Sequence, residues 1–454
     1  MSDDRPNVLL IHCHDLGQYL GCYGVDIETP NIDDLAERGT LFENHFVTAP
    51  QCSPSRGSLM TGRYPHVNGL MGLAHGSWEL HDDEYIMPQY FGDAGYETHL
   101  FGLQHITQDT DRLGYDYVHS EGNLYPGVSP AVHQANRARN VADVVTTFLE
   151  RDAGDDPFFA SVGFFELHRV EEENGRFGFE PDHYETDDPD DIRPLPYLPD
   201  RRGIRRDLGE MHGMVYAVDE AMRTIVDCLE STGLEEETVV IFTTEHGIAF
   251  PRAKGSCYDA GIEGVLIWAG PETVSGQRRT ELITNVDVLP TLLEIGDIEV
   301  PGTVQLDGRS FRPLLTGVFD DDPDAYDPHE RLFAEMTWHD MYNPVRAIRT
   351  EHYKYVRNFW HLPKVYLTKD CYASESGREV RERYGAPPRP YEELYDLYED
   401  PQEADNVAFE PRYSEIRRDL SEQLHTWMKE TNDPLLEEPI PPGDYGTIEA
   451  WPHQ

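Results

Sequence analysis

Short apolar runs alternate with longer stretches of helical periodicity along most of this chain of 454 residues. Runs such as VLLI (8–11) and VVIF (239–242) contain no polar residue. Strands that are buried on both faces have this pattern, and the segments between them form helices that cover the sheet. The alternation therefore predicts an α/β fold, in which a large, mostly parallel sheet is sandwiched by helices.

The pattern changes after LDGRSFRPLL (306–315). Residues 345–359 alternate between apolar and polar side chains, as antiparallel strands do, and a helix is predicted near 412–430. A chain of this length can also form one large domain and a smaller one. We therefore predict an α/β domain over residues 1–320 and a smaller C-terminal α+β subdomain over residues 321–454.

Four of the apolar runs are followed by acidic or imidazole side chains. The runs and the residues after them are 8–11 with His14 and Asp15, 98–101 with His105, 158–165 with His168, and 239–242 with Glu245 and His246. One such residue alone is usually a turn former or a helix cap. Ligands of open α/β sheets bind outside the carboxyl ends of the strands, so four such endings predict a shared site. Carboxylates and imidazoles together favour a metal ion.

A cysteine stands where a loop meets a helix in TAPQCSPSRGSLMTG (48–62). Ser53 is a suitable N-cap and Pro54 suits the first helical position, which places Cys52 beside unpaired backbone N–H groups. Arg56 follows one turn later. Most buried free cysteines only fill space, and we predict this for Cys228. The helix start and Arg56 make Cys52 a candidate reactive residue.

The chain is strongly acidic, with 85 acidic residues, 37 basic residues and a formal net charge of -48. Only five of the basic residues are lysines. This composition is typical of proteins adapted to molar salt, where charge repulsion is screened, although a merely solubilising surface is the alternative. It argues against nucleic acid as a partner, because no basic patch could release counterions. A small anionic substrate would need a locally positive pocket.

Six scattered cysteines form no CxxC pair, which favours reduced thiols. No apolar run approaches the length of a membrane span, so no membrane partner is predicted. The N-terminal sequence MSDDRPNVLL is acidic and contains neither a basic segment nor a small-residue cleavage site. We therefore expect no export and a cytoplasmic location.

Several segments resemble the sulfatase family. CSPSR (52–56) followed by LMTGR (59–63) is similar to the sulfatase signature, and TTEHG (243–247) falls where sulfatases have a related segment. The similarity extends over nearly the whole chain. NGLMGLAHG (68–76) and FPRAKGSCY (250–258) resemble the branch that contains heparan N-sulfatase (sulfamidase) and its microbial relatives.

The resemblance implies an alkaline-phosphatase-like fold and a covalent mechanism. Cys52 would be converted to formylglycine by a formylglycine-generating enzyme, and the hydrated aldehyde would carry two hydroxyls. One hydroxyl would attack the sulfur of a small sulfated substrate and displace its alcohol or amine. Deprotonation of the other would then expel sulfate and restore the aldehyde.

The resemblance also implies a metal site and a catalytic set. The implied metal ligands are His14, Asp15, Glu245, His246 and the modified Cys52. The implied catalytic residues are Cys52, Arg56, His105, His168 and Lys254. Arg56 would hold the nucleophile, and His105 would act as a base toward the diol. His168 and Lys254 would bind the sulfuryl group and assist the leaving group.

Several positions depart from the family pattern. His14 and Glu245 stand where the family usually has aspartate, and Leu103 stands where it has a sulfate-binding lysine. Gln51 is unusual just before the modified cysteine. With His246 as a second imidazole the ligand set is softer, so manganese or zinc competes with the calcium that the family favours. His14 is either a fourth protein ligand or a hydrogen-bonding partner of one.

Three functions are compatible with these residues. The first is hydrolysis of sulfate esters or sulfamates, with sulfated sugars as one substrate class. The second is hydrolysis of phosphate diesters or phosphonate monoesters on the same fold, because both chemistries use a metal-bound nucleophile. The third is a non-catalytic relative that binds sulfated glycans. The sequence leaves the natural substrate, the identity of the metal, the modification of Cys52 and the oligomeric state open.

Overall fold

The computed structural model describes residues 5–441 except 120–128, 155, 173–174 and 386–387. Its main sheet has eight strands in the order β11-β2-β10-β9-β1-β6-β4-β5. Their bounds are β1 Asn7–Cys13, β2 Thr40–Phe42, β4 Glu97–Gly102, β5 Tyr117–Val118, β6 Phe158–Gly163, β9 Thr238–Thr244, β10 Leu266–Ala269 and β11 Gln277–Arg279. The central strands are parallel, and only β10 runs antiparallel to its neighbours in this sheet. The predicted large, mostly parallel sheet is therefore confirmed.

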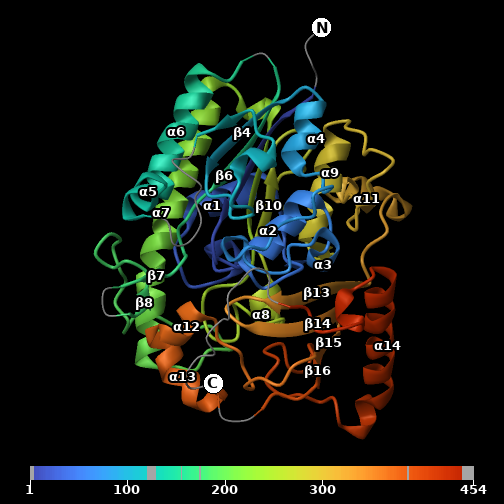
Figure 1. The fold of residues 1–454 in the computed structure, drawn as a ribbon. Coiled ribbons are helices and arrows are strands. Elements are labelled where there is room, and N and C mark those ends of the chain that lie inside the picture. Colours follow the sequence, from blue (N-terminus) through green and yellow to red (C-terminus); the bar gives the residue numbers. More distant parts are fainter. Residues whose placement is uncertain (1–4, 120–128, 155, 173–174, 386–387, 442–454) are drawn as a thin grey trace.

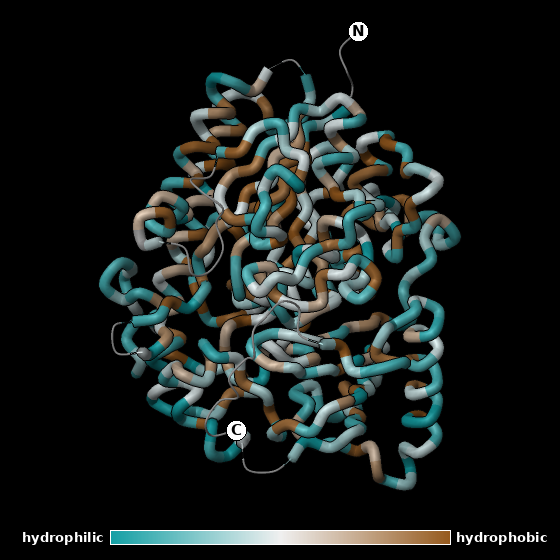
Figure 2. The backbone as a smooth tube through the Cα atoms, viewed as in Figure 1, coloured by the Kyte–Doolittle hydropathy of each residue, from teal (hydrophilic) through white to brown (hydrophobic). Residues whose placement is uncertain are grey.

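Helices cover both faces of this sheet (Figure 1). Along β1, Leu9 and Ile11 pack into one core, whereas Val8 and Leu10 pack into the other. The first core is closed by α1 Pro30–Arg38, α6 Ala138–Arg151 and α7 Arg202–Thr232, and the second by α2 Cys52–Thr61, α4 Met87–Asp93 and α9 Val288–Ile295. Figure 2 shows hydrophobic chain concentrated between these layers. Burial on both faces explains why the strands read as uninterrupted apolar runs.

A second, antiparallel sheet forms the C-terminal part of the molecule, drawn in orange in Figure 1. Its strands are β13 Arg331–Trp338, β14 Tyr342–Thr350, β15 Tyr353–Asn358 and β16 Glu392–Asp396. One face packs on α14 Ser414–Glu430 through Ile348 and Tyr355. The predicted α+β subdomain is confirmed in kind, and the domain boundary at residue 320 stays a prediction.

The remaining helices and strands are short. They are α3 Pro65–Asn68, α5 Pro130–Ala135, α8 Asp259–Ile262, α10 Arg312–Leu315, α11 Val318–Asp321, α12 Lys369–Ala373, α13 Glu375–Gly385, β3 His45–Phe46 with β12 Ile283–Thr284, and β7 Val170–Glu171 with β8 Phe177–Gly178. Within the described part of the chain, none of the helices has the length and apolar character that crossing a membrane requires.

Hydrogen bonds connect the second sheet to the N-terminal part of the chain, close to Cys52. The Gln51 side chain donates a hydrogen bond to the Trp338 carbonyl at 2.9 Å, and the Trp338 N–H donates to the Met71 carbonyl at 3.1 Å. The turn between β13 and β14 is therefore fixed beside the start of α2. Residues of the turn between β13 and β14 therefore lie near Cys52, the first residue of α2.

A buried ionic network strengthens this junction. The Arg346 guanidinium contacts Asp433 at 2.6 Å and Glu335 at 3.1 Å, and Glu335 also bonds to His66 Nδ1 at 2.8 Å. All four side chains are buried, so each charge has to be compensated by its partners rather than by water. The network links β13 and β14 with α3 and with the segment after α14.

Candidate active site

The carboxyl ends of four strands place their polar residues around one centre. The residues are His14 and Asp15 after β1, His105 after β4, His168 after β6, and Glu245 and His246 after β9. His14 Nδ1 lies 2.5 Å from Glu245 Oε1, and His246 Nε2 lies 3.2 Å from Asp15 Oδ1. His14 and His168 meet edge to face with ring centroids 4.7 Å apart. The four strand endings converge, as the sequence predicts.

Two of these residues have strained backbones. Asp15 and His105 adopt φ values of 46° and 53°, in the left-handed region that non-glycine residues rarely occupy. Both residues are fully buried immediately beyond their strands. Such strain is retained where the surrounding structure holds it, and it is concentrated at functional sites.

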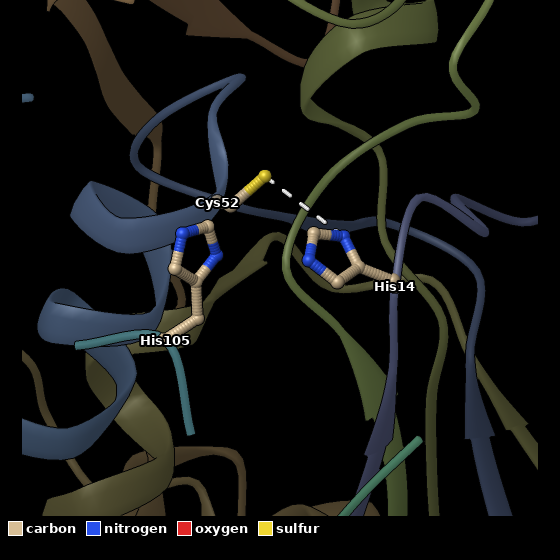
Figure 3. A group of neighbouring side chains, drawn as sticks. All are labelled: His14, Cys52 and His105. Atoms are coloured by element: carbon tan, nitrogen blue, oxygen red, sulfur yellow. Dashed lines mark hydrogen bonds between the residues drawn. The ribbon is translucent and has the colours of Figure 1, made fainter. Parts of the chain in front are cut away.

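Cys52 is the first residue of α2 and lies inside this cluster. Its Sγ atom is 3.4 Å from His246 Nε2 and 3.9 Å from His14 Nδ1 (Figure 3). Burial alone would raise the pKa of the thiol, but the positive charges of Lys254, His14 and His246 lower it well below its usual value. The environment therefore favours the thiolate, which is the reactive form of cysteine.

The predicted cap of this helix is wrong by two residues. Gln51, not Ser53, is the N-cap, and it makes no side-chain capping bond. The Ser53 hydroxyl instead accepts a hydrogen bond from the Ala74 N–H at 3.0 Å. Because that tertiary bond occupies the hydroxyl, the helix begins earlier and Cys52 itself becomes its first residue.

Arg56 acts on the site through a carboxylate. Its Nη2 lies 3.1 Å from Glu245 Oε2, and its Nη1 forms a hydrogen bond with His12 Nδ1. Glu245 therefore has one oxygen near Arg56 and the other near His14. In this structure Arg56 contacts Glu245, and its hold on the nucleophile stays a prediction.

Lys254 is buried between two carboxylates. Its Nζ lies 2.8 Å from Asp15 Oδ2 and 3.0 Å from Asp370 Oδ2. Burial lowers the pKa of Lys254, but the two carboxylates outweigh this and raise it well above its usual value. Lys254 is therefore a fixed positive charge, and α12 contributes the carboxylate of Asp370 to the site.

The residues fit a divalent metal ion. His14, Asp15, Cys52 and Glu245 are all buried, and each offers a ligand atom within 4.8 Å of the others. Burial raises the pKa of both carboxyls, but Lys254 lowers that of Asp15 and Arg56 lowers that of Glu245, and His14 lowers both further, so both are ionised. His14 Nε2 is buried and has no hydrogen-bond partner among the described residues. His246 lies beside this set, since its Nε2 is 3.4 Å from the Cys52 sulfur.

Comparison with known proteins agrees with this geometry. The family model for sulfatases matches residues 6–298. The chain belongs to the sulfatase family. A second model, described as N-sulphoglucosamine sulphohydrolase, C-terminal, matches residues 245–388. The human N-sulphoglucosamine sulphohydrolase is 28% identical to this sulfatase, over 96% of this chain and 94% of the human protein.

Solved structures show the same fold. A 2-O GAG sulfatase superposes on this sulfatase with a TM-score of 0.69 at 23% identity, covering 96% of this chain and 94% of the other. The phosphonate monoester hydrolase of Agrobacterium radiobacter also gives a TM-score of 0.69, at 21% identity, covering 94% of this chain and 96% of the other. The alkaline-phosphatase-like fold and the resemblance to sulfatases are thus confirmed, and this sulfatase is a sulfuric ester hydrolase.

The site of this sulfatase also contains residues that the sequence did not single out. His75 Nδ1 lies 3.0 Å from His105 Nε2, and the two rings are stacked. Burial lowers the pKa of His105 to about 3, so this imidazole is neutral. His75 lies in a 3-10 helix of three residues, Ala74–Gly76, and the sequence around it gives no signal of this contact.

The turn between β13 and β14 supplies a further imidazole to this sulfatase. His339 Nδ1 lies 3.1 Å from Asp340 Oδ2. Burial lowers the pKa of His339, but the Asp340 carboxylate and a hydrogen bond with the Cys52 thiol raise it to about 10. The contact crosses from the second sheet to the first part of the chain, so only the tertiary fold reveals it.

Proposed function

We propose that this sulfatase hydrolyses sulfated sugars, as sulfate esters or sulfamates, through a formylglycine hydrate derived from Cys52. The observation that carries the proposal is the position of Cys52, which is buried at the first residue of α2 among His14, His246 and Lys254. The similarity over nearly its whole length to a sulphohydrolase of N-sulphoglucosamine supports a sugar substrate. Maturation would require a formylglycine-generating enzyme, and we propose a cytoplasmic location.

We propose that one divalent metal ion is held by His14, Asp15, Glu245, His246 and the modified Cys52. Calcium is the ion that the family favours, and the imidazoles of His14 and His246 make manganese or zinc the alternatives. When bound, the ion would supply positive charge that stabilises negative charge on the nucleophile and on the sulfuryl oxygens. The ionised carboxylates of Asp15 and Glu245 are the hard oxygen ligands of this set.

The protein residues have separate roles in this proposal. Lys254 presents a permanent positive charge to the sulfuryl group, and Arg56 and Asp370 hold the surrounding charges in place. His105 would act as the base toward the diol, with its ring oriented by His75. Fixed charges in a buried site stabilise charge that develops during reaction more strongly than the same groups could in water.

The second candidate is a phosphonate monoester or phosphodiester hydrolase, and the similarity in fold to such an enzyme favours it. The decisive experiment compares matched phenyl sulfate, phenyl phosphonate and glucosamine N-sulfate substrates with enzyme whose modification has been confirmed. We expect the highest kcat/KM on a sulfated substrate. A higher value on the phosphonate would replace the proposed function by the second candidate. Binding of sulfated glycans without any turnover would support the non-catalytic alternative.

Loss of Lys254 or His168 should affect poor leaving groups more than good ones. His168 lies after β6, and its Nδ1 donates a hydrogen bond to the Arg169 carbonyl at 2.7 Å, so its Nε2 would have to be protonated before it could give a proton to the leaving group. Nitrophenyl sulfate departs readily, whereas a sugar sulfate or sulfamate needs a proton. For Lys254→Ala and His168→Ala we expect kcat/KM to fall about 10²–10⁴-fold on the sugar substrate and markedly less on nitrophenyl sulfate.

The exposed Lys364 gives a matched control, because Lys364→Ala removes a lysine far less buried than Lys254. Equal losses on the two substrates would mean that Lys254 and His168 only bind sulfate. The proton for the leaving group would then have to come from another residue.

We further propose that the protein is adapted to molar salt. The 85 acidic residues greatly exceed the 37 basic ones, so repulsion between carboxylates should weaken the folded state when screening falls. We expect the melting temperature to rise steadily between dilute buffer and molar potassium chloride. Melting curves that do not change with salt would show that the acidity only solubilises the surface.

A further inference from the structure

We propose that Cys52, before any modification, forms a zinc site with His14 and His105. This inference goes beyond the proposed function, because it concerns the thiol and a soft metal rather than the formylglycine and the metal of hydrolysis. The three side chains are buried, and each offers one ligand atom within 4.8 Å of the other two. A cysteine thiolate with two imidazoles is a ligand set that zinc favours.

Two buried nitrogens of this set are free to bind metal. His14 Nε2 and His105 Nδ1 have no hydrogen-bond partner among the described residues. Figure 3 shows the two rings turned toward one another, with the Cys52 side chain directed into the space beside them. An unpartnered buried nitrogen is costly, and a metal ion in this space would satisfy both.

The other nitrogen of each imidazole ring, His14 Nδ1 and His105 Nε2, already has a polar partner. Glu245 Oε1 lies 2.5 Å from His14 Nδ1, and His75 Nδ1 lies 3.0 Å from His105 Nε2. Histidine ligands of metals are typically oriented by a second partner of this kind, which fixes the tautomer and the ring. Each imidazole of the proposed site is therefore held by a partner on its other nitrogen, as metal-bound histidines usually are.

The distances are close to those of a bound ion. From Zn–S of about 2.3 Å and Zn–N of about 2.0 Å, ligand atoms of a tetrahedral site lie roughly 3.3–3.6 Å apart. Side-chain movements of about 1 Å would bring the three atoms to this spacing. His246 is a candidate for the fourth ligand, since its Nε2 lies 3.4 Å from the sulfur and its Nδ1 bonds to the Gly247 carbonyl at 2.8 Å.

The site exists only while the sulfur is present. The proposed modification replaces the thiol by oxygen, which is a ligand for hard ions, so the soft set is lost when Cys52 is converted. His14 belongs to both ligand sets, and the two metals therefore cannot use it at the same time. Zinc on the unmodified protein would occupy the Cys52 sulfur and protect it from reagents that attack thiols.

The test is titration of the unmodified, full-length protein with cobalt(II) and then zinc(II), after mass spectrometry confirms the free thiol. We expect one equivalent of cobalt to give the near-ultraviolet charge-transfer absorption of a thiolate ligand, and zinc to abolish it. Cys52→Ser should lose the absorption, whereas the matched variant Cys228→Ser should retain it. His75→Ala should weaken binding about 10–100-fold, because it releases the ring of His105.

Absence of the thiolate absorption in folded wild-type protein, or its persistence in Cys52→Ser, would overturn the proposal. Circular dichroism of each variant confirms folding. A second readout is alkylation, since one equivalent of zinc should slow reaction of Cys52 and leave that of the other thiols unchanged. Neither readout uses sulfate hydrolysis, so a failure of the proposed function would leave both results interpretable.

Discussion

Cys52→Ala should abolish sulfate hydrolysis while leaving the protein folded. Removing the group from which the nucleophile is made should lower kcat by about 10⁴–10⁶-fold. The change deletes a single buried sulfur atom, so the free energy of unfolding should fall by only about 1 kcal/mol. Steady-state kinetics on a sulfated substrate, together with thermal unfolding, measure the two effects separately.

Cys228→Ala is the matched control for this variant. Cys228 is also a buried free cysteine, but it lies in α7 and its thiol contacts the Thr146 carbonyl of α6. The free energy of unfolding of the Cys228→Ala variant should fall by an amount similar to that of Cys52→Ala, and the variant should retain its activity. A Cys52→Ala protein with kcat near that of the wild type would refute the assignment of Cys52 as the source of the nucleophile.

Removal of divalent metal from the matured enzyme should also eliminate activity. Asp15, Glu245 and His14 each offer a ligand atom within 4.8 Å of the others. Hydrolysis needs the positive charge of a bound ion beside the nucleophile. We expect a chelator to lower kcat/KM by about 10²–10³-fold or more, and one divalent ion to restore it. Titration with calcium, manganese and zinc in turn identifies that ion.

Glu245→Gln should prevent this restoration or shift it to much higher metal concentration. The change removes one ionised ligand and also the partner of Arg56, so some loss of stability accompanies it. Glu236→Gln, an exposed carboxylate just before the opposite end of β9, controls for the loss of one negative charge. Full activity in thoroughly metal-free wild-type enzyme would contradict the metal site.

Local sequence was sufficient to predict much of the site. His14 and Asp15, and likewise Glu245 and His246, directly follow the parallel strands that two of the apolar runs form. Parallel strands bring their carboxyl ends to one edge, so these residues converge without further information. Cys52 was found because a loop that turns into a helix has a recognisable composition. The roles of these residues in catalysis remain predictions.

Tertiary packing determined the parts that the sequence did not reveal. His339 reaches Cys52 only because Gln51 and Met71 fix the turn after β13, and these contacts join segments far apart in the chain. The ion pair between Asp370 and Lys254 likewise joins two segments that are far apart in the chain. The Ser53 cap was wrong because a distant N–H group competes for its hydroxyl. Such side-chain contacts follow from the complete fold and not from local periodicity.

Release of sulfate from glucosamine N-sulfate, measured against the fraction of Cys52 that is converted to formylglycine, tests the central claim most directly. Mass spectrometry of the peptide that contains Cys52 gives the converted fraction for each preparation. We predict that the rate rises in proportion to this fraction and extrapolates to zero for unconverted protein. A rate that is independent of conversion, or fully converted and metal-loaded protein that releases no sulfate, would contradict the account.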